Sequence, residues 1–181
     1  MRCSLLLAAL VAAAPALAAP QPQSELDKLF GQLAKTETAE DAKPIEGKIA
    51  GLFRQSGSAT IDLLMSRAEA ALGAQDNKTA EKLLASVTDL DPAYAEGWHA
   101  RAGMQAAANN DTAAMVSLQK VVQLNPRQFE AMAELAGMLE DYGDKAGALK
   151  LYRRALALDP QLEGAARKVK ALIHDVEGQD I

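Results

Sequence analysis

Apolar side chains recur every three or four positions along most of the chain, which is the spacing of one face of an α-helix. The first such stretch lies within residues 24–56. It contains two periodic sets, made of Leu26, Leu29, Phe30 and Leu33, and then of Ile45, Ile49, Leu52 and Phe53. The second set ends before Ser56-Gly57-Ser58, a segment typical of a turn. The pattern therefore predicts a helical hairpin within an N-terminal unit of residues 20–60.

The next segment is divided by three dipeptides, Asp91-Pro92, Asn125-Pro126 and Asp159-Pro160, whose prolines are 34 residues apart. Each dipeptide follows an apolar run of helical period. Proline disfavours the α conformation in the residue before it and is itself well suited to begin a helix. Each dipeptide therefore predicts the end of one helix and the approach to the next. We expect three copies of a two-helix unit, at residues 61–94, 95–128 and 129–162.

This 34-residue period resembles the tetratricopeptide-repeat family, and the resemblance covers residues 61–162. With proline as position 32, small residues fall at positions 8 and 20 and larger ones at position 4: Ala68, Ala102 and Ala136; Ala80, Ala114 and Ala148; Leu64, Trp98 and Met132. Arg67 and Arg101 depart from the leucine usual at position 7, and Ala71 and Gln105 depart from the usual tyrosine. The resemblance implies an all-α fold, a right-handed superhelix of antiparallel helix pairs, with Trp98 in a packing position.

Both ends of this array carry further helical pattern. Residues 163–181 form a terminal unit. An apolar stripe starts at Leu162, the last residue of the third repeat, and continues into this unit through Ala166, Val169, Leu172, Ile173 and Val176. Such a helix can cover the exposed face of the last repeat, so we expect a C-terminal capping helix and a tail. The N-terminal hairpin can be either a degenerate repeat or a cap, because it lacks a proline at position 32.

The first 19 residues have the order of a secretory signal peptide. Arg2 precedes an uninterrupted apolar run from Leu5 to Ala14, and Ala16-Leu17-Ala18 supplies a small-x-small cleavage pattern. The run is much shorter than the roughly 20 apolar residues of a membrane-spanning helix, and the alternative is a buried N-terminal helix. We expect cleavage after Ala18 or Ala19 and a periplasmic location in a Gram-negative bacterium. We expect no stable membrane span after cleavage.

Composition narrows the classes of function. The chain has 19 Lys and Arg against 24 Asp and Glu, a net charge of −5, so a basic surface for nucleic acid is not expected. Cys3 is the only cysteine, and His99 and His174 are too far apart in sequence to suggest a metal site. No nucleophile, phosphate-binding or metalloprotease motif is present. We therefore expect no catalysis, no metal and no cofactor.

The resemblance also indicates where a partner would bind, because positions 2, 5, 9 and 12 of each first helix line the concave groove in this family. The candidate partner-binding residues are Asp62, Met65, Glu69, Glu96, His99, Glu130, Ala133 and Glu140. Leu72, Gly103, Ala106 and Gly137 fill the other groove positions. The alternatives are an ordinary solvated acidic face and, for His99, a solvated surface histidine. In the groove, His99 is expected to add pH dependence to binding near its usual pKa of roughly 6.5.

The chemistry of these groove positions favours some partners over others. One subtype of the family binds a C-terminal carboxylate with lysine, asparagine and arginine, but this chain has Met65 and Glu69 at two of those places. None of the eight candidates is Lys or Arg, so a neutral or basic protein segment is the expected partner. The sequence thus indicates an exported scaffold or adaptor. A self-assembling structural envelope protein and an enzyme with an unrecognised site remain as alternatives.

Overall fold

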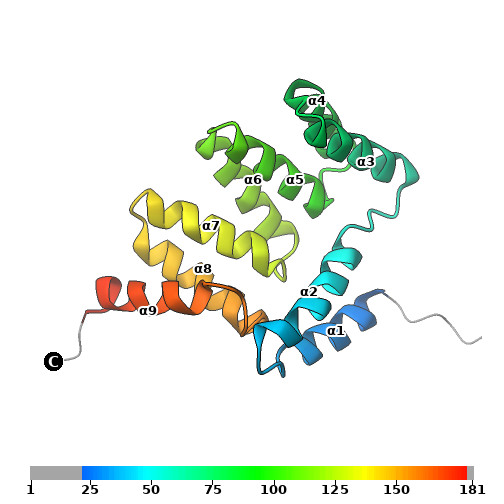
Figure 1. Cartoon of the computed structure of the whole chain (residues 1–181). Coiled ribbons are helices and arrows are strands. Elements are labelled where there is room, and N and C mark those ends of the chain that lie inside the picture. The colour runs from blue at the N-terminus through cyan, green and yellow to red at the C-terminus, as the bar shows by residue number, and fades with distance from the viewer. Residues whose placement is uncertain (1–21, 179–181) are drawn as a thin grey trace, which may run out of the picture.

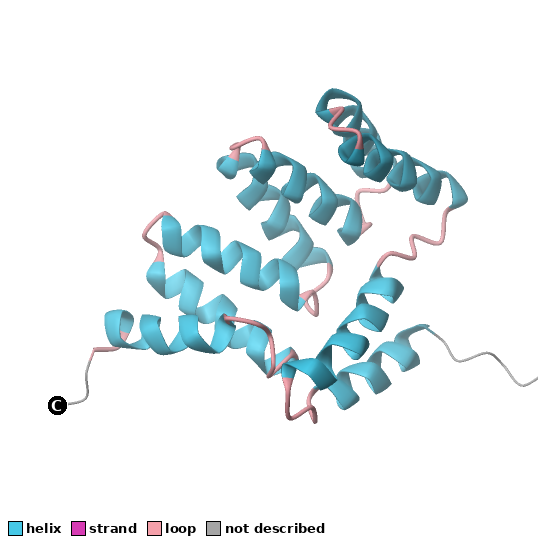
Figure 2. Cartoon of the chain, viewed as in Figure 1, coloured by secondary structure: helices cyan, strands magenta, loops and turns pink. Residues whose placement is uncertain are grey.

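The computed structural model describes residues 22–178, and this part of the chain contains nine α-helices and no strand (Figures 1 and 2). The helices are α1 (Pro22–Leu33), α2 (Ala39–Phe53), α3 (Ala59–Gly73), α4 (Asn77–Leu90), α5 (Ala95–Ala107), α6 (Asp111–Leu124), α7 (Phe129–Asp141), α8 (Lys145–Leu158) and α9 (Ala165–Val176). The predicted signal peptide lies outside the described residues. The expected all-α superhelix of antiparallel pairs is confirmed.

Each predicted repeat folds as a helix pair whose second helix begins in the same way. Asp76, Asn110 and Asp144 cap α4, α6 and α8 by accepting a hydrogen bond from the backbone N–H three residues later, at 3.1, 3.3 and 2.9 Å. The residue just before the cap of α8 is Gly143, with φ of +88°. Glycine adopts this left-handed backbone conformation without a steric penalty. The short turn therefore reverses the chain and starts the next helix in one step.

The connections between repeats are also alike, because each begins with the Asp or Asn of an Asx-Pro dipeptide. The Oδ1 atoms of Asp91, Asn125 and Asp159 accept hydrogen bonds from backbone N–H groups two residues later, at 3.1, 3.1 and 3.0 Å. These turns cluster on one side of the array. We call residues 91–94, 125–128 and 159–164 the turn edge.

Close packing within the repeats follows the small residues. The alanines at positions 8 and 20 are at most 1% exposed in all three copies, and the larger residues Leu84, Leu118 and Tyr152 at position 24 are at most 5% exposed. Every helix from α3 to α9 packs on the next one along the chain. Leu172 of α9 is buried, and Arg153 of α8 pairs with Glu177 at 2.6 Å. The last helix therefore caps the array, as predicted.

The first pair, α3 and α4, has one open side. Position 3 of the first helix is Gly97 in the second copy and Ala131 in the third, and both are buried. A β-carbon at Gly97 would lie 2.6 Å from Val87, so glycine is what lets α5 approach α4 so closely. Leu63 occupies the same position in α3 and is 52% exposed. No preceding helix pair covers α3 as α4 covers α5.

The N-terminal hairpin of α1 and α2 lies instead along the turn edge (Figure 1). Phe30 packs edge-on against Phe129, with 6.2 Å between ring centroids, and the buried residues of the hairpin join the hydrophobic core of α5–α9. The first pair has a separate core built around Ile61, Leu84 and Tyr94. The hairpin thus lies beside the later repeats rather than stacking on α3 as a further repeat.

One contact joins the hairpin to each turn of the turn edge. The Tyr94 hydroxyl donates to the Arg54 carbonyl at 2.8 Å, and the Gln161 amide donates to the Thr36 carbonyl at 3.0 Å. Between them, Arg127 donates to Asp27 at 2.5 Å, and its guanidinium lies 4.0 Å from the centroid of the Phe30 ring. The hairpin therefore bridges all three turns. Among the helices of residues 22–178, none combines the length and the apolar character needed to cross a membrane.

Candidate functional site

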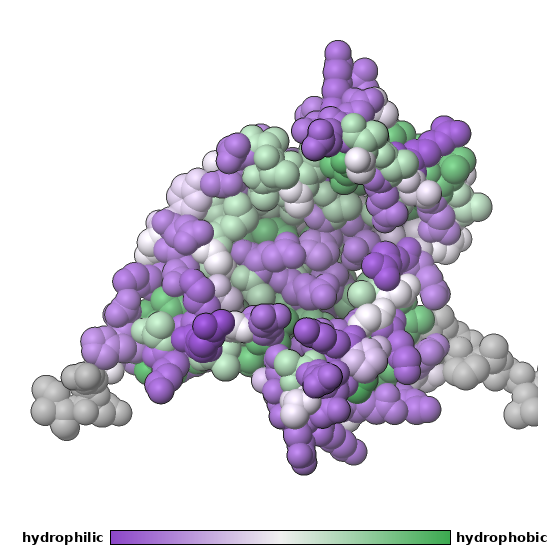
Figure 3. Space-filling view, viewed as in Figure 1, coloured by the Kyte–Doolittle hydropathy of each residue, from purple (hydrophilic) through white to green (hydrophobic). Residues whose placement is uncertain are grey.

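The candidate residues are on α3, α5 and α7, the first helices of the three pairs. Hydrophilic side chains gather over α5 and α7, on a face framed by α3, α2 and α9 (Figure 3). We call this the inner face. It contains two hollows, one beside α3 and one beside α9, and a cluster of polar residues centred on His99.

The first hollow has a volume of about 160 Å³ and is lined by Arg54, Asp62, Met65, Ser66, Glu69 and Tyr94. Asp62 and Glu69 are exposed, whereas Met65 is only 8% exposed and belongs to the core of the first pair. Ser56 donates a hydrogen bond to Asp62 at 2.6 Å. Two of the three candidates on α3 thus present carboxylates to solvent, and the third mainly supports the helix from beneath.

His99 lies at the centre of the polar cluster and joins α5 to α7. Its Nε2 is 3.1 Å from Glu134, and its Nδ1 is 3.7 Å from Glu96 and 3.4 Å from the amide of Gln128. Gln128 also donates to Glu96 at 3.2 Å. Two carboxylates therefore hold the imidazole ring between neighbouring repeats, and the buried Gln128 amide orients one of them, Glu96.

These partners change the charge state of His99. Burial lowers its pKa, but the hydrogen bonds that the ring donates to Glu134 and Glu96 outweigh burial and raise the pKa to about 10. His99 is therefore a cation at neutral pH, with 15% of its side chain exposed. The expectation that it titrates near 6.5 is wrong, because that value belongs to an imidazole without two carboxylate neighbours.

Glu130 is half-buried next to this cluster, and burial is the main reason that its pKa is raised. The positive charge of His99 lowers it, while Glu134 and Glu96 raise it further. Three carboxyl groups thus surround one imidazolium. The positive charge of His99 therefore neutralises part of the negative charge that the sequence predicts for this face. The exposed negative charge of the cluster lies mainly on Glu134, whose side chain is 50% exposed.

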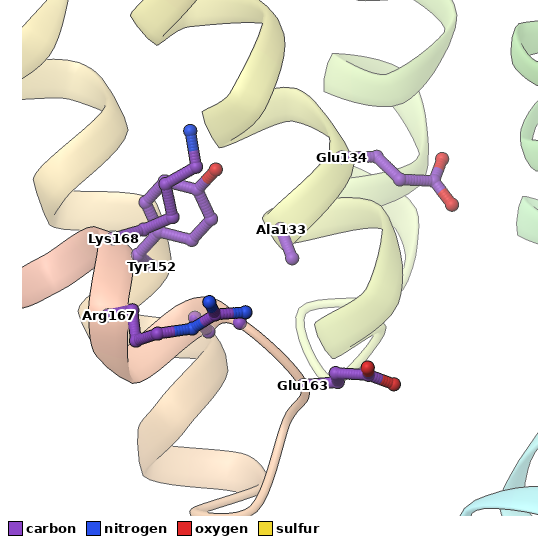
Figure 4. A pocket seen from close by; sticks show the side chains of 8 residues that line it. Ala133, Glu134, Tyr152, Glu163, Arg167 and Lys168 are labelled. Carbon is purple, nitrogen blue, oxygen red and sulfur yellow. The ribbon is translucent and has the colours of Figure 1, made fainter.

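The second hollow is larger, about 490 Å³, and lies between α7 and α9 (Figure 4). Glu134 and Ala133 line it from α7, while Arg167 and Lys168 extend from α9 beside Tyr152. Lys168 pairs with Glu140 at 3.0 Å. Arg167 is exposed and has no ion pair within the described part of the chain. The inner face is consequently acidic beside α3 and basic beside α9.

The inner face presents charged and hydrogen-bonding side chains on an open surface. Within residues 22–178, no group of three or more His, Cys, Asp or Glu side chains is placed to hold a metal ion. The hollows are open and lined by charged groups and small apolar side chains, which suits a polypeptide surface.

Comparison with known proteins agrees with this architecture. No family model matches the chain. A curated protein from Rhizobium etli, named as a TPR repeat-containing protein, is 34% identical over 102 residues, which are 56% of this chain and 50% of that protein. The helix pairs observed here repeat with the same 34-residue period that defines such proteins. The chain therefore has the tetratricopeptide-repeat fold. It spans about half the length of its curated relative.

Solved structures similar to this chain share its fold at low sequence identity. A crystal structure of MamA matches with a TM-score of 0.60 and 17% identity, covering 80% of this chain and 88% of MamA. The first TPR of Spaghetti (RPAP3) bound to an HSP90 peptide matches with a TM-score of 0.58 and 17% identity, covering 65% and 93%. The Yersinia enterocolitica chaperone SycD with a peptide of the translocator YopD matches with a TM-score of 0.58 and 16% identity, covering 65% and 95%.

Sequence reasoning missed several residues of the inner face. Arg167 follows Ala133 by 34 residues, just as Ala133 follows His99. Extending the same period into α9 would therefore have predicted a basic residue there. Arg54 carried no such signal, since it reaches the first hollow only because the hairpin bridges the turn edge.

Proposed function

We propose that this tetratricopeptide-repeat protein is a non-catalytic scaffold or adaptor that binds a protein or peptide segment on its inner face. The observation that carries the proposal is the pair of open hollows flanking the His99 cluster on one continuous face. Two proteins of similar fold have structures with bound peptides, one of HSP90 and one of YopD. These complexes support a peptide-binding role for a face of this shape.

The charge of the inner face favours a neutral or basic segment over α3–α7. Asp62, Glu69 and Glu134 present exposed carboxylates there, while His99 neutralises only part of the cluster. An anionic segment would meet repulsion in a concave site whose walls concentrate the field. A lysine or arginine of the partner would pair with these carboxylates.

Export to the periplasm is the second part of the proposal. It rests on the order of Arg2, the apolar run and the small-residue cleavage pattern in residues 1–19. Mass spectrometry of the native protein tests it. A mature N-terminus at Ala19 or Pro20 is the expected result, and an intact N-terminus at Met1 or Arg2 would contradict export by this route.

Selection from a random peptide display library tests the binding function. We expect enriched peptides that carry net positive charge and lose binding to a Glu69→Lys, Glu134→Lys variant. The matched control is a Glu81→Lys, Asp89→Lys variant, which makes the same change of charge at exposed positions of α4, the second helix of its pair. Absence of enrichment, or peptides that bind the inner-face variant as tightly as the wild type, would count against the proposal.

A self-assembling structural protein is a second candidate, because the open side of the first pair is apolar. Leu63 and Leu90 are 52% and 63% exposed, and such leucines are buried when repeats stack. Sedimentation at two protein concentrations distinguishes the candidates. Association that grows with concentration and disappears in a Leu63→Ser, Leu90→Ser variant would favour self-assembly, whereas a concentration-independent monomer would exclude it.

A further inference from the structure

Asp159, in the turn between α8 and α9, is the one acidic side chain of the described residues that is fully buried. Its Oδ1 accepts the Gln161 backbone hydrogen bond, while its Oδ2 is buried and has no conventional hydrogen-bond partner. Asp91 and Asn125 make the same local bond in the other two turns, but both are only partly buried. The Asx side chain of the third turn is therefore covered by other residues, whereas those of the first two turns are partly open to solvent.

The N-terminal hairpin provides that cover. Gln161 donates to the Thr36 carbonyl at 3.0 Å, which fixes the loop between α1 and α2 over the turn. Glu46, on α2, brings its own carboxyl within hydrogen-bonding reach of Asp159. Two carboxylates cannot both remain ionised in such a place without strong repulsion. A single proton on Glu46 removes the repulsion and lets the Glu46 O–H donate to Asp159.

Burial and the surrounding charges favour protonation of the Glu46 carboxyl group. Burial raises the pKa of Glu46, the negative charge of Asp159 and its hydrogen bond raise it further, and Glu130 of α7 adds to them. Lys43, also on α2, opposes the shift, and the resulting pKa is about 7. Burial raises the pKa of Asp159 as well. The effect of Lys43 on the Glu46 pKa is thus outweighed by burial and by carboxyl groups from the turn and from α7.

We propose that the Glu46–Asp159 pair is a proton-dependent latch that holds the N-terminal hairpin against the turn edge and releases it when both carboxyl groups are ionised. Release would free the α1–α2 loop from the third turn, while the Arg127 and Tyr94 contacts hold the rest of the hairpin. The latch needs no ligand and does not depend on the proposed binding function.

The direction of the pH effect follows from linkage. Glu46 binds its proton more tightly in the closed state than in the open state, where its ordinary pKa is 4.5. The stabilisation of the closed hairpin by the latch is therefore complete below pH 4.5, and it is lost as pH rises through about 7. Because Glu46 is partly exposed, solvent screening reduces the effect. We expect the opening equilibrium of the hairpin to increase roughly tenfold to a hundredfold between pH 5 and pH 8.

Hydrogen–deuterium exchange of the full chain at pH 5, 6, 7 and 8, corrected for intrinsic exchange rates, tests the latch. We expect protection of residues 36–53 to fall with pH while protection of α7 and α8 stays constant. Asp159→Asn should abolish the fall, because asparagine keeps the local hydrogen bond, as Asn125 does in the second turn, and can donate to Glu46. Glu46→Gln should do the same from the other side. The matched control, Glu40→Gln at an exposed position of α2, should retain the wild-type profile.

A wild-type profile without a pH step would overturn the proposal, as would an Asp159→Asn profile equal to the wild type. Simultaneous loosening of all helices would also overturn it, because it would indicate a global effect rather than release of the hairpin. Carboxyl ¹³C NMR provides a test on the unmodified protein. Titration of the Glu46 carboxyl near pH 7 is the expected result, and titration near 4.5 would eliminate the latch even if a variant failed to fold.

Discussion

Ala136 illustrates how much of this fold depends on single small side chains. It lies at position 8 of the third copy and is completely buried, as is Ala148 at position 20. Both positions hold alanine in every copy, so that the two helices of a pair can approach closely. A larger side chain at this crossing has no space into which it can move.

We therefore predict that Ala136→Leu destabilises the protein by about 1–3 kcal/mol, the usual cost of overpacking a close-packed core. Urea unfolding measured by circular dichroism gives the change. Glu130→Gln is the control in the same helix, and its effect should remain within about 0.5 kcal/mol, because the change relieves repulsion from Glu96 and Glu134. A larger loss for Glu130→Gln than for Ala136→Leu would contradict the repeat register.

His99 gives a second prediction at this scale. Its pKa is raised to about 10 in the folded protein, so its stabilising effect is complete below the ordinary value of 6.5 and declines as pH rises through 10. His99→Gln should therefore cost about 1.5–3 kcal/mol at pH 6, the range for hydrogen bonds to charged groups, and much less above pH 10. Urea midpoints at both pH values test this, with the exposed His174→Gln as control. A cost that is equal at pH 6 and above pH 10 would show that the imidazolium charge is not responsible.

The sequence predicted the packing position of Ala136 but not the charge state of His99, and the difference has a physical reason. The alanine positions repeat every 34 residues, so the period alone identifies them. The charge state of His99 depends on Glu96, three residues before it on the same helix, and on Glu134, which is 35 residues away on the next repeat. Helical periodicity says which face a residue is on, but it does not say which side chains of the neighbouring helix that residue meets.

At the scale of elements, the sequence pattern predicts the helices of the α1–α2 hairpin but not where the hairpin packs. Its apolar period predicted two helices, and the structure has them at Pro22–Leu33 and Ala39–Phe53. Its position was left open between a degenerate repeat and a cap. The contacts that fix it join residues 100 and 125 positions apart, from Asp27 to Arg127 and from Thr36 to Gln161. Neither contact belongs to the 34-residue period, so the period could not predict them.

Arg127 should be the main anchor of α1. It donates to Asp27 and to the Leu26 carbonyl, and its guanidinium covers the Phe30 ring. We predict that Arg127→Ala lowers the local stability of α1 by roughly 1–2 kcal/mol, the sum expected for a partly exposed ion pair and a cation–π contact.

Amide exchange measured at a single pH tests this prediction. Protection should fall in α1, with little change in α3 and α4, whose core is separate. Arg154→Ala, an exposed change on α8, is the control. An equal loss of protection in α3 and α4 would show that Arg127 supports the whole array rather than the hairpin.

For the whole molecule, the important feature is that charge is not evenly distributed over the inner face. The period predicted acidic positions on α3, α5 and α7, of which Asp62 and Glu69 are exposed, and Glu134, which the period did not single out, is exposed as well. The basic end formed by Arg167 and Lys168 was missed, because α9 was regarded as a cap. It serves as a cap and also continues the inner face, since the last helix of a repeat array presents the same positions as the helices before it.

This charge distribution leads to a prediction about salt. A basic peptide selected on the inner face should bind less tightly as sodium chloride is raised from 50 to 500 mM, because screening weakens exposed ion pairs. Losing one or two pairs of up to about 1 kcal/mol each corresponds to a decrease in affinity of roughly tenfold. Isothermal titration calorimetry of wild type and of a Glu69→Gln, Glu134→Gln variant provides the measurement. The variant should bind more weakly at low salt and approach the wild type at high salt, whereas Glu81→Gln, Asp89→Gln on α4 should behave as the wild type. Affinity that is independent of salt, with the same value in the wild type and the inner-face variant, would mean that these carboxylates are only a solvated surface.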